Sequence, residues 1–314
     1  MNGKDVKIKV KNLQQCLELK AGAARLVVAP HIGGAIVAYK HVLANREYHW
    51  LRPVDSVHVQ NGNVSEMASF PLVPWAGRIR DGRFEYEGRH IGYPSLKKDS
   101  PHSIHGFVRD RQWEVREHTD TRVVLEYVHE PDHWPFSFRA EQVFELAENN
   151  LTVHLNIHNT GQQSMPLGMG HHPYFPKNEH TRLKARVGKA WYGDQDVMPV
   201  KLAEHPLARE MAQGIEVARH VLDTPFMDWD HEAQISWPDE QRKLMMTADA
   251  PFDFLIVYSP EGAPWFCAEP FSNVTDCFNL RQTHSAREVG GQDVLPGQIV
   301  NTRFSLTPVF YKDD

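Results

Sequence analysis

The strongest constraint on this fold is a strict alternation of apolar and polar residues. It is clearest in residues 151–158, LTVHLNIH, where every second residue is aliphatic. A period of two places one face of a strand against a core and the other face in solvent. Residues 138–146 precede this strand, and the turn-like residues 147–150 separate the two segments. We therefore expect the two segments to form a β-hairpin.

Similar hairpins are expected elsewhere, and helix signals are sparse. Twenty glycines and 21 prolines punctuate short strands, which is typical of an all-β sandwich or barrel. Residues 184–220 are the least regular segment and are expected to hold a short helix near 207–213. No flexible linker divides the chain, so residues 1–314 are expected to form a single domain. Further strands are expected at 113–119 with 122–130, at 253–259 with 265–269, and within 83–91.

Charge and cysteine content argue against several classes of function. The chain has a formal net charge of -6 and a pI near 6.3, which disfavours binding to nucleic acid or to an anionic membrane. Three cysteines at irregular spacing form neither a disulfide framework nor a zinc motif. The first ten residues lack the apolar stretch of a secretion signal, and no apolar run is long enough to span a membrane. These absences lead us to expect a cytoplasmic protein.

Four segments break the alternation and combine Pro or Gly with Trp, His, Arg and Glu. The first is FPLVPWAGRIRDGRF at 70–84, which contains Arg78. Arg78 is either a surface residue before the turn or a fork of hydrogen-bond donors for substrate hydroxyls. The second is SPHSIHGF at 100–107. Its two histidines, His102 and His105, are either a surface or capping pair or part of a site.

The third segment, PLGMGHHPYFP at 166–176, contains two adjacent histidines. Neighbouring residues of an extended chain point in different directions, so at most one of His171 and His172 easily faces a given pocket. No acidic residue stands at ligand spacing in this segment, which leaves a cupin-like metal site as a weaker alternative. The chain contains no nucleophile elbow, Walker A loop, dinucleotide-binding loop or H-E-x-x-H motif.

The fourth segment, PWFCAEPFSNVTDCFNL at 264–280, contains a carboxylate on an expected strand. Alternation places Glu269 on the same strand face as Trp265 and Cys267. A carboxylate in such surroundings is either a salt-bridge partner at a rim or a pocket base with a raised pKa. The residues alone leave both interpretations open.

Together these segments resemble the aldose 1-epimerase (galactose mutarotase-like) family. The resemblance extends from about residue 29 to about residue 308, and each of the four segments resembles a motif of that family. LDTPF at 222–226 and LPGQ at 295–298 resemble two further motifs, and all occur in the family's order. The resemblance implies a large antiparallel β super-sandwich, which agrees with the expected strands.

The resemblance also implies a role for each site residue. His172 would be the general acid at the ring oxygen of a sugar, and Glu269 would be the general base at the anomeric hydroxyl. His105 would help to bind and orient the sugar, while Arg78 and Asp223 would hold sugar hydroxyls. The implied partner is a small-molecule sugar, with no cofactor and no metal. The sequence defines no oligomeric state.

Two departures from the family pattern bear on substrate preference. Many members have Asn before the arginine, where this chain has Gly77, and a Thr-His-like pair after Glu-Pro, where this chain has Phe-Ser-Asn at 271–273. Three aromatic residues, Trp75, Tyr174 and Phe175, either stack on the sugar or belong to the core.

We therefore expect an isomerase that interconverts the α and β anomers of a free aldose by ring opening and reclosure. Opening takes a proton from O1 and gives one to the ring oxygen, so one base and one acid are expected on opposite sides of the C1–O5 region. A non-catalytic sugar-binding protein of this fold would have lost the acid or the base. A sugar-phosphate 1-epimerase would need a cationic cradle. Candidates for it are Arg80, Arg83, Lys97 and Lys98, but all four are explained more simply as solvated charges.

Overall fold

The computed structural model describes residues 16–95 and 100–311. The N-terminal residues considered for a secretion signal lie outside this range, as do Lys97 and Lys98. Antiparallel β-sheet dominates the described chain, as the alternation predicts. No described helix is both long enough and apolar enough to cross a membrane.

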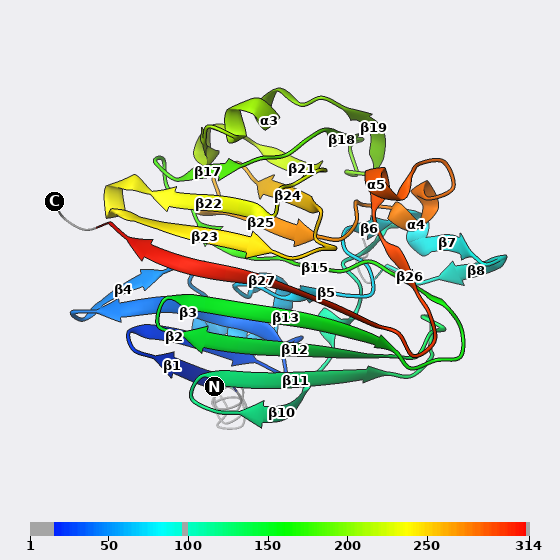
Figure 1. The fold of residues 1–314 in the computed structure, drawn as a ribbon, viewed down its shortest axis with the longest axis horizontal. Helices are drawn as coiled ribbons and strands as arrows, with labels where there is room; N and C mark the ends of the chain where they lie inside the picture. The colour runs from blue at the N-terminus through cyan, green and yellow to red at the C-terminus, as the bar shows by residue number, and fades with distance from the viewer. Residues whose placement is uncertain (1–15, 96–99, 312–314) are drawn as a thin grey trace, which may run out of the picture.

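A nine-stranded sheet forms one layer of the molecule (Figure 1). Its strand order is β10-β11-β12-β13-β27-β23-β22-β17-β20. The hairpins expected from the sequence at 113–130, 138–158 and 253–269 are confirmed by the observed strand pairing. The C-terminal strand β27 pairs with β13 on one side and β23 on the other, so it joins the two halves of the sheet. The strands are β10 (Glu114–His118), β11 (Arg122–His129), β12 (Phe138–Ala147), β13 (Asn150–Asn159), β17 (Arg182–Ala185), β20 (Ile215–Glu216), β22 (Glu232–Trp237), β23 (Arg242–Ala248) and β27 (Ile299–Phe310).

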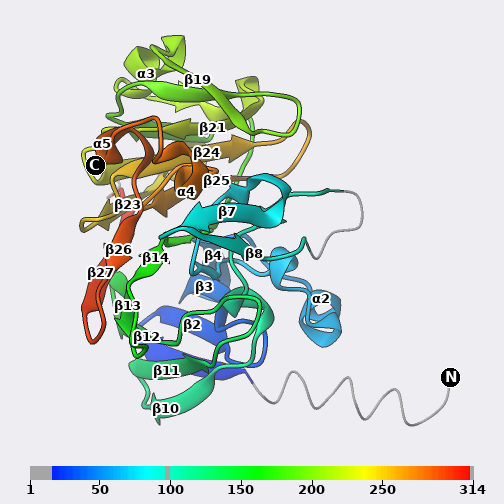
Figure 2. The same ribbon diagram turned by 90° about the vertical axis from the view of Figure 1, so that its right-hand side faces the viewer.

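Two further sheets lie on the same side of the nine-stranded sheet and complete the sandwich (Figures 1 and 2). The four-stranded sheet contains β1 (Leu17–Ala21), β2 (Ala24–Ala29), β3 (Ala35–Leu43) and β4 (Arg46–His49). The eight-stranded sheet has the order β19-β18-β21-β24-β25-β15-β5, and β16 also pairs with β25. Its strands are β5 (Pro71–Leu72), β15 (Gly170–His171), β16 (Tyr174–Pro176), β18 (Ala190–Gly193), β19 (Pro199–Ala203), β21 (Leu222–Phe226), β24 (Phe254–Ser259) and β25 (Trp265–Phe271).

Short helices, 3-10 turns and strand pairs connect the strands of these sheets. The helix expected near 207–213 is confirmed as α3. The helices are α2 (Ser56–Asn61), α3 (Pro206–Met211), α4 (Cys277–Leu280) and α5 (Ala286–Val289), with 3-10 turns η1 (Val64–Glu66), η2 (Arg80–Gly82), η3 (Val108–Asp110), η4 (Val217–Arg219) and η5 (Pro238–Glu240). The remaining strands form three pairs: β6 (Arg78–Ile79) with β9 (Ser103–Ile104), β7 (Arg83–Tyr86) with β8 (Arg89–Gly92), and β14 (Met165–Leu167) with β26 (Gln292–Val294).

An aromatic cluster supports the loops that carry the first two sequence segments. Phe107 is fully buried and stacks on Tyr93 with ring centroids 5.0 Å apart. Trp75 packs edge-on against both rings and tilts against Trp134 at 5.5 Å. Trp75 is therefore a core residue, and so is Phe175, which is fully buried. Aromatic pairs of this kind are worth about 0.5–1.5 kcal/mol beyond their burial, so the cluster fixes the loop that follows His105.

The close approach at Gly106 leads to a first prediction. Gly106 has a φ of 62°, and a Cβ there would lie 1.9 Å from the carbonyl oxygen of Val73. Gly88 has a similar φ of 73° in the β7–β8 turn, but a Cβ there would meet no atom within 4 Å. Both alanine variants carry a left-handed penalty of roughly 1–2 kcal/mol. Only Gly106→Ala adds a backbone clash, which we expect to cost about 1–3 kcal/mol more.

Denaturant unfolding of the two variants checks this expectation, and Gly88→Ala serves as the matched control for backbone strain. Equal losses of unfolding free energy in Gly106→Ala and Gly88→Ala would contradict it.

Candidate active site

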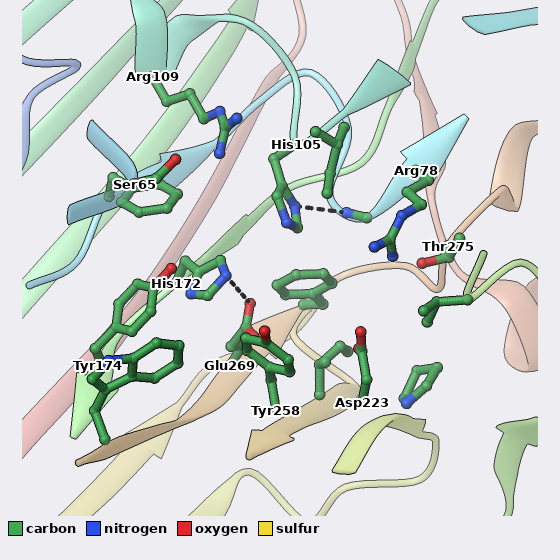
Figure 3. Close-up of a pocket in the computed structure, with 18 of the residues that line it drawn as sticks. Ser65, Arg78, His105, Arg109, His172, Tyr174, Asp223, Tyr258, Glu269 and Thr275 are labelled. Carbon is green, nitrogen blue, oxygen red and sulfur yellow. Dashed lines mark hydrogen bonds and ion pairs between the residues drawn. The ribbon is translucent and has the colours of Figure 1, made fainter. Parts of the chain in front are cut away.

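A pocket opens over the eight-stranded sheet where β21, β24 and β25 lie side by side (Figure 3). Asp223 on β21 is directly opposite Tyr258 on β24, and Tyr258 is opposite Cys267 on β25. Since alternate residues share a strand face, Glu269 points to the same side as these residues. The pocket volume is about 280 Å³, just below the roughly 300–1,000 Å³ range of ligand pockets. Its size therefore suits a single small molecule.

The opposite wall comes from the first two sequence segments. Strands β6 and β9 pair so that Arg78 is opposite Ile104, which brings the arginine next to the following residue, His105. The N–H of His105 donates to the Gly77 carbonyl at 2.8 Å. Gly77 has a φ of 75°, and a Cβ there would lie 2.6 Å from Oγ1 of Thr275. A larger residue at position 77 would therefore press against Thr275 in the pocket wall, so the present packing suits a glycine there.

A backbone hydrogen bond fixes the orientation of the His105 ring. The N–H of Gly77 donates to Nδ1 of His105 at 3.2 Å, so Nε2 carries the hydrogen of the neutral ring. His105 also has a φ of 64°, a conformation that costs a non-glycine residue about 1–2 kcal/mol. The site thus holds His105 as a hydrogen-bond donor, which suits a sugar oxygen.

The structure separates the two adjacent histidines, as the sequence predicts. His172 lines the pocket, where its ring stacks on Tyr174 at 4.5 Å and tilts against Phe70 at 5.0 Å. His171 instead points into the core and packs against Phe304 at 4.7 Å. Burial lowers the pKa of His171 to about 3. Only His172 is therefore placed to meet a ligand in this pocket.

His172 and Glu269 meet in the wall of the pocket. Nε2 of His172 lies 3.6 Å from Oε2 of Glu269, and both side chains are almost fully buried. Burial lowers the pKa of His172 well below 6.5, and the positive charges of Arg109 and Arg52 lower it further. Burial raises the pKa of Glu269 well above 4.5. These shifts have opposite signs, and burial thereby disfavours the charged form of each group.

Asp223 and Arg78 modify the carboxyl of Glu269 in opposite directions. After burial, the negative charge of Asp223 raises the pKa of Glu269, and the positive charge of Arg78 lowers it. Asp223 is open to the pocket, yet the surrounding walls also raise its own pKa by desolvation, which Arg78 partly offsets. Arg78 therefore stabilises both carboxylates. It also lines the space that a ligand would occupy.

The five residues predicted for the site all line this one pocket: Arg78, His105, His172, Asp223 and Glu269. Trp265 and Tyr174 also line it. His102 does not. It is buried, and its Nδ1 accepts a hydrogen bond from the backbone of Asp81.

Sequence analysis missed two arginines of the pocket wall, Arg52 and Arg109. Arg109 stands four residues after His105, so an extension of the second segment would have included it. Arg52 belongs to none of the four segments and carries no comparable signal. Of the residues considered for a phosphate cradle, Arg80 pairs with Asp276 and neither it nor Arg83 lines the pocket.

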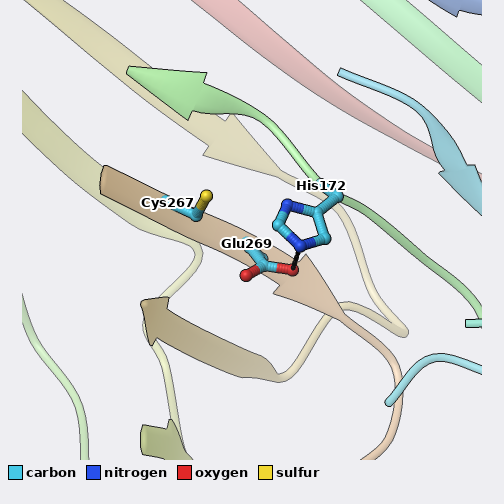
Figure 4. A group of neighbouring side chains, drawn as sticks. All are labelled: His172, Cys267 and Glu269. Atoms are coloured by element: carbon cyan, nitrogen blue, oxygen red, sulfur yellow. Dashed lines mark ion pairs between the residues drawn. The ribbon is translucent and has the colours of Figure 1, made fainter. Parts of the chain in front are cut away.

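One group of possible metal ligands lies within residues 16–95 and 100–311 (Figure 4). It consists of His172, Cys267 and Glu269, whose ligand atoms lie within 4.8 Å of one another. Burial raises the pKa of the Cys267 thiol well above its usual value, and a thiol binds metals as the thiolate. Cys267 also lies behind the pocket surface rather than on it. These three residues therefore fit a metal poorly.

Comparison with known proteins identifies related chains. A family model described as aldose 1-epimerase matches residues 15–307. The chain is 30% identical over 257 residues to a protein of Escherichia coli K12 called uncharacterized protein YphB, covering 79% of this chain and 86% of that protein.

Solved structures share the fold. A galactose mutarotase-like protein from Clostridium acetobutylicum superimposes with a TM-score of 0.85 at 19% identity, covering 94% of this chain and 95% of that chain. Galactose 1-epimerase from Lactobacillus acidophilus gives a TM-score of 0.74 at 16% identity, covering 94% of each chain. The expected super-sandwich is thus confirmed.

The burial of Glu269 leads to a second prediction, about stability and pH. The folded carboxyl keeps its proton at pH values where an unfolded one, with a pKa near 4.5, has lost it. The contribution of this group to the free energy of unfolding is therefore present below pH 4.5 and is lost as pH rises through the raised pKa. Glu269→Gln removes this dependence, so we expect it to melt higher than wild type at about pH 8. Below about pH 4.5 the two proteins should melt at similar temperatures.

Thermal unfolding of both proteins across this pH range provides the measurement. A wild-type protein that is more stable than Glu269→Gln at about pH 8 would show that the carboxyl is better solvated or paired than its burial indicates.

Proposed function

The chain belongs to the aldose 1-epimerase family, and on that premise we propose that it interconverts the α and β anomers of a free aldose. The observation that carries this proposal is the contact between His172 and Glu269, 3.6 Å apart in the pocket wall. The substrate oxygens O1 and O5 are both bonded to C1, so they lie close together. An acid and a base this close approach the C1–O5 region from one side, not from the opposite sides expected from the sequence, and they can still serve one oxygen each.

The proposed reaction moves two protons and breaks one ring bond. The carboxylate of Glu269 takes the proton from O1, and the imidazolium of His172 gives a proton to the ring oxygen. The C1–O5 bond breaks, and O1 becomes the oxygen of an aldehyde. Rotation about C1–C2 presents the other face of the aldehyde, and closure returns both protons along the same paths. Each placed proton-transfer group contributes roughly 10²–10⁴-fold to the rate.

Three other pocket residues would hold the sugar. His105 would donate from Nε2, because its Nδ1 is occupied by the Gly77 N–H. Arg78 would donate to hydroxyls, and Asp223 would accept from them. A sugar-binding protein without activity would gain nothing from two buried ionisable groups in contact, because burying such groups lowers the stability of the fold.

We also propose that residues 1–314 act as one domain, since one hydrophobic cluster includes residues of all three large sheets.

The third prediction tests the proposed base. Glu269→Gln keeps the shape of the side chain but cannot accept a proton at neutral pH. We expect it to bind sugar within roughly tenfold of wild type, or about 1.4 kcal/mol, and to lose at least about 10²-fold in anomer exchange. Asp223→Asn alters another carboxylate of the same pocket, and it should raise KM more than it lowers kcat.

NMR exchange at C1 and calorimetric binding on the same samples separate these effects. A folded Glu269→Gln protein that exchanges anomers at close to the wild-type rate would remove Glu269 from the reaction.

The fourth prediction tests the proposed acid. His172→Asn should lower kcat by about 10²-fold or more, because an amide cannot replace a general acid. His171→Asn is the matched control, since His171 is adjacent in sequence but faces the core. We expect it to lower the melting temperature and to leave the kcat of the folded fraction much less affected. The reverse order of the two kcat values would reject His172 as the acid.

A further inference from the structure

Arg109 is a buried cation with few interactions that offset its loss of hydration. It lies in the turn η3, and its side chain is only 11% exposed. Its guanidinium lies 5.5 Å from the Phe70 ring and lines the pocket. Its one ion pair among the described residues is with Asp110, at 3.7 Å, and its buried Nε has no hydrogen-bond partner there. The guanidinium therefore retains unused donors beside the pocket.

Arg52 adds a second positive charge to the same pocket. Its guanidinium donates to the backbone carbonyls of Ser65 and Met67 at 2.6 and 2.8 Å, and it lies 3.5 Å from the centre of the Tyr174 ring. No carboxylate of the described chain lies within ion-pair distance of it. Glu66 also lines the pocket and acts on Arg52, but it is absent from the groups that influence Arg109.

Burying these two charges is unfavourable for folding. Desolvation lowers the pKa of both Arg52 and Arg109, which is the sign of a charged form deprived of water. A guanidinium is suited to carboxylates and phosphates because its planar fork can bind two oxygens at once. An anionic ligand group would restore the interactions that burial removes.

The arginines lie at a defined end of the pocket. Arg109 and Arg52 act on His172, whereas Arg78 and Asp223 act on Glu269. Figure 3 shows Arg109 and Arg78 on opposite sides of His105. If Glu269 serves O1 and His172 serves the ring oxygen, the next ring atom beyond His172 is C5. The substituent on C5 is C6, and this orientation would place it at the Arg109 end, because Figure 3 shows His172 between Glu269 and Arg109.

We propose that the substrate of this pocket is an aldose with an anionic group on C6, bound directly by Arg109 and supported by the charge of Arg52. The orientation rests on the proposed function, because the roles of Glu269 and His172 define where C6 lies. A carboxylate and a phosphoester share this chemistry, and a preference for the phosphoester would replace the free aldose of the proposed function by a sugar phosphate. The residues differ from Arg80 and Arg83, which do not line the pocket.

An anion at this position would also favour the reactive protonation state. Burial lowers the pKa of His172 and the two arginines lower it further, while burial raises the pKa of Glu269, so these shifts all oppose a charged His172–Glu269 pair. The proposed reaction begins with that charged pair, a protonated His172 and an ionised Glu269. A negative group beside Arg109 offsets the positive field and raises the pKa of His172. The substrate charge would thus prepare its own general acid.

The fifth prediction compares neutral and anionic sugars of the same configuration. NMR exchange at C1, corrected for the uncatalysed rate, gives kcat/KM for glucose, glucuronate and glucose 6-phosphate. We expect at least one anionic sugar to exceed glucose by about tenfold or more, equivalent to about 1.4 kcal/mol. Preference for glucuronate indicates a carboxylate, and preference for glucose 6-phosphate indicates a phosphoester.

Two substitutions connect this preference to Arg109. Arg109→Met should reduce the ratio of anionic to neutral kcat/KM to near one, and Arg109→Lys should give an intermediate ratio. Arg111→Met is the matched control. Arg111 lies two residues away, is 45% exposed, and does not line the pocket, so its loss should leave the ratio unchanged. Ratios within one variant cancel any partial loss of folded protein.

The outcomes distinguish this inference from the proposed function. Exchange of glucose without any anionic preference in wild type overturns the inference and leaves the proposed function intact. A preference that survives Arg109→Met also overturns it. If no sugar is exchanged, the proposed function fails, and calorimetry with glucose and glucuronate decides the inference. Tighter glucuronate binding that Arg109→Met abolishes supports the anionic site, and equal affinities reject it.

Discussion

Burial of the Glu269 carboxyl is the constraint on which the rest of the site depends. A carboxylate removed from water is unfavourable unless it is paired or hydrogen-bonded, and Oε2 of Glu269 has no hydrogen-bond partner within the described chain, with Nε2 of His172 3.6 Å away. The strand cannot move to relieve this, because β25 pairs with β24 on one side and with β15 and β16 on the other. The rigid sheet therefore holds the carboxyl where its pKa is raised, ready to exchange a proton.

Loops from distant parts of the chain must then meet around this carboxyl, and buried side chains just after it hold them there. Nδ2 of Asn273 donates to the Ala76 carbonyl at 2.8 Å, which anchors the loop before Arg78. Oγ of Ser272 accepts a hydrogen bond from the Met169 backbone at 2.8 Å, which anchors the loop before His172. Neither Ser272 nor Asn273 lines the pocket. The unusual residues after Glu-Pro thus position the walls, and only Phe271 of that group reaches the ligand space.

Local sequence predicts the hairpins of this fold because their alternation and turns lie within about 20 residues of one another. It does not predict the pairing of β13 with β27, which joins residues more than 140 positions apart, since every strand of this kind offers the same backbone bonds. The same limit applies to the site. His172 could be chosen over His171, and Glu269 as the base, because family motifs resemble their segments, whereas alternation gave only the strand face of Glu269. Arg52 could not be found, because its place in the wall depends on long-range packing rather than on any pattern near it.

Proton conservation connects the depth of the pocket to the proposed chemistry. In the proposed ring opening, one proton arrives on Glu269 as another leaves His172, so the pair holds the same number of protons before and after. No exchange with bulk water is needed during the step, and a pocket wall that excludes water is compatible with turnover. Exclusion of water also strengthens the interactions between charged groups in the wall, and after burial itself Arg109 and Arg52 lower the pKa of His172. The positive charge of Arg109 and Arg52 disfavours the imidazolium of His172, so it would oppose the reaction of a neutral sugar. A bound negative substituent would offset this charge and remove the opposition. The arginine end therefore ties substrate charge to the protonation of the acid, in a way that sugar hydroxyls alone cannot reproduce.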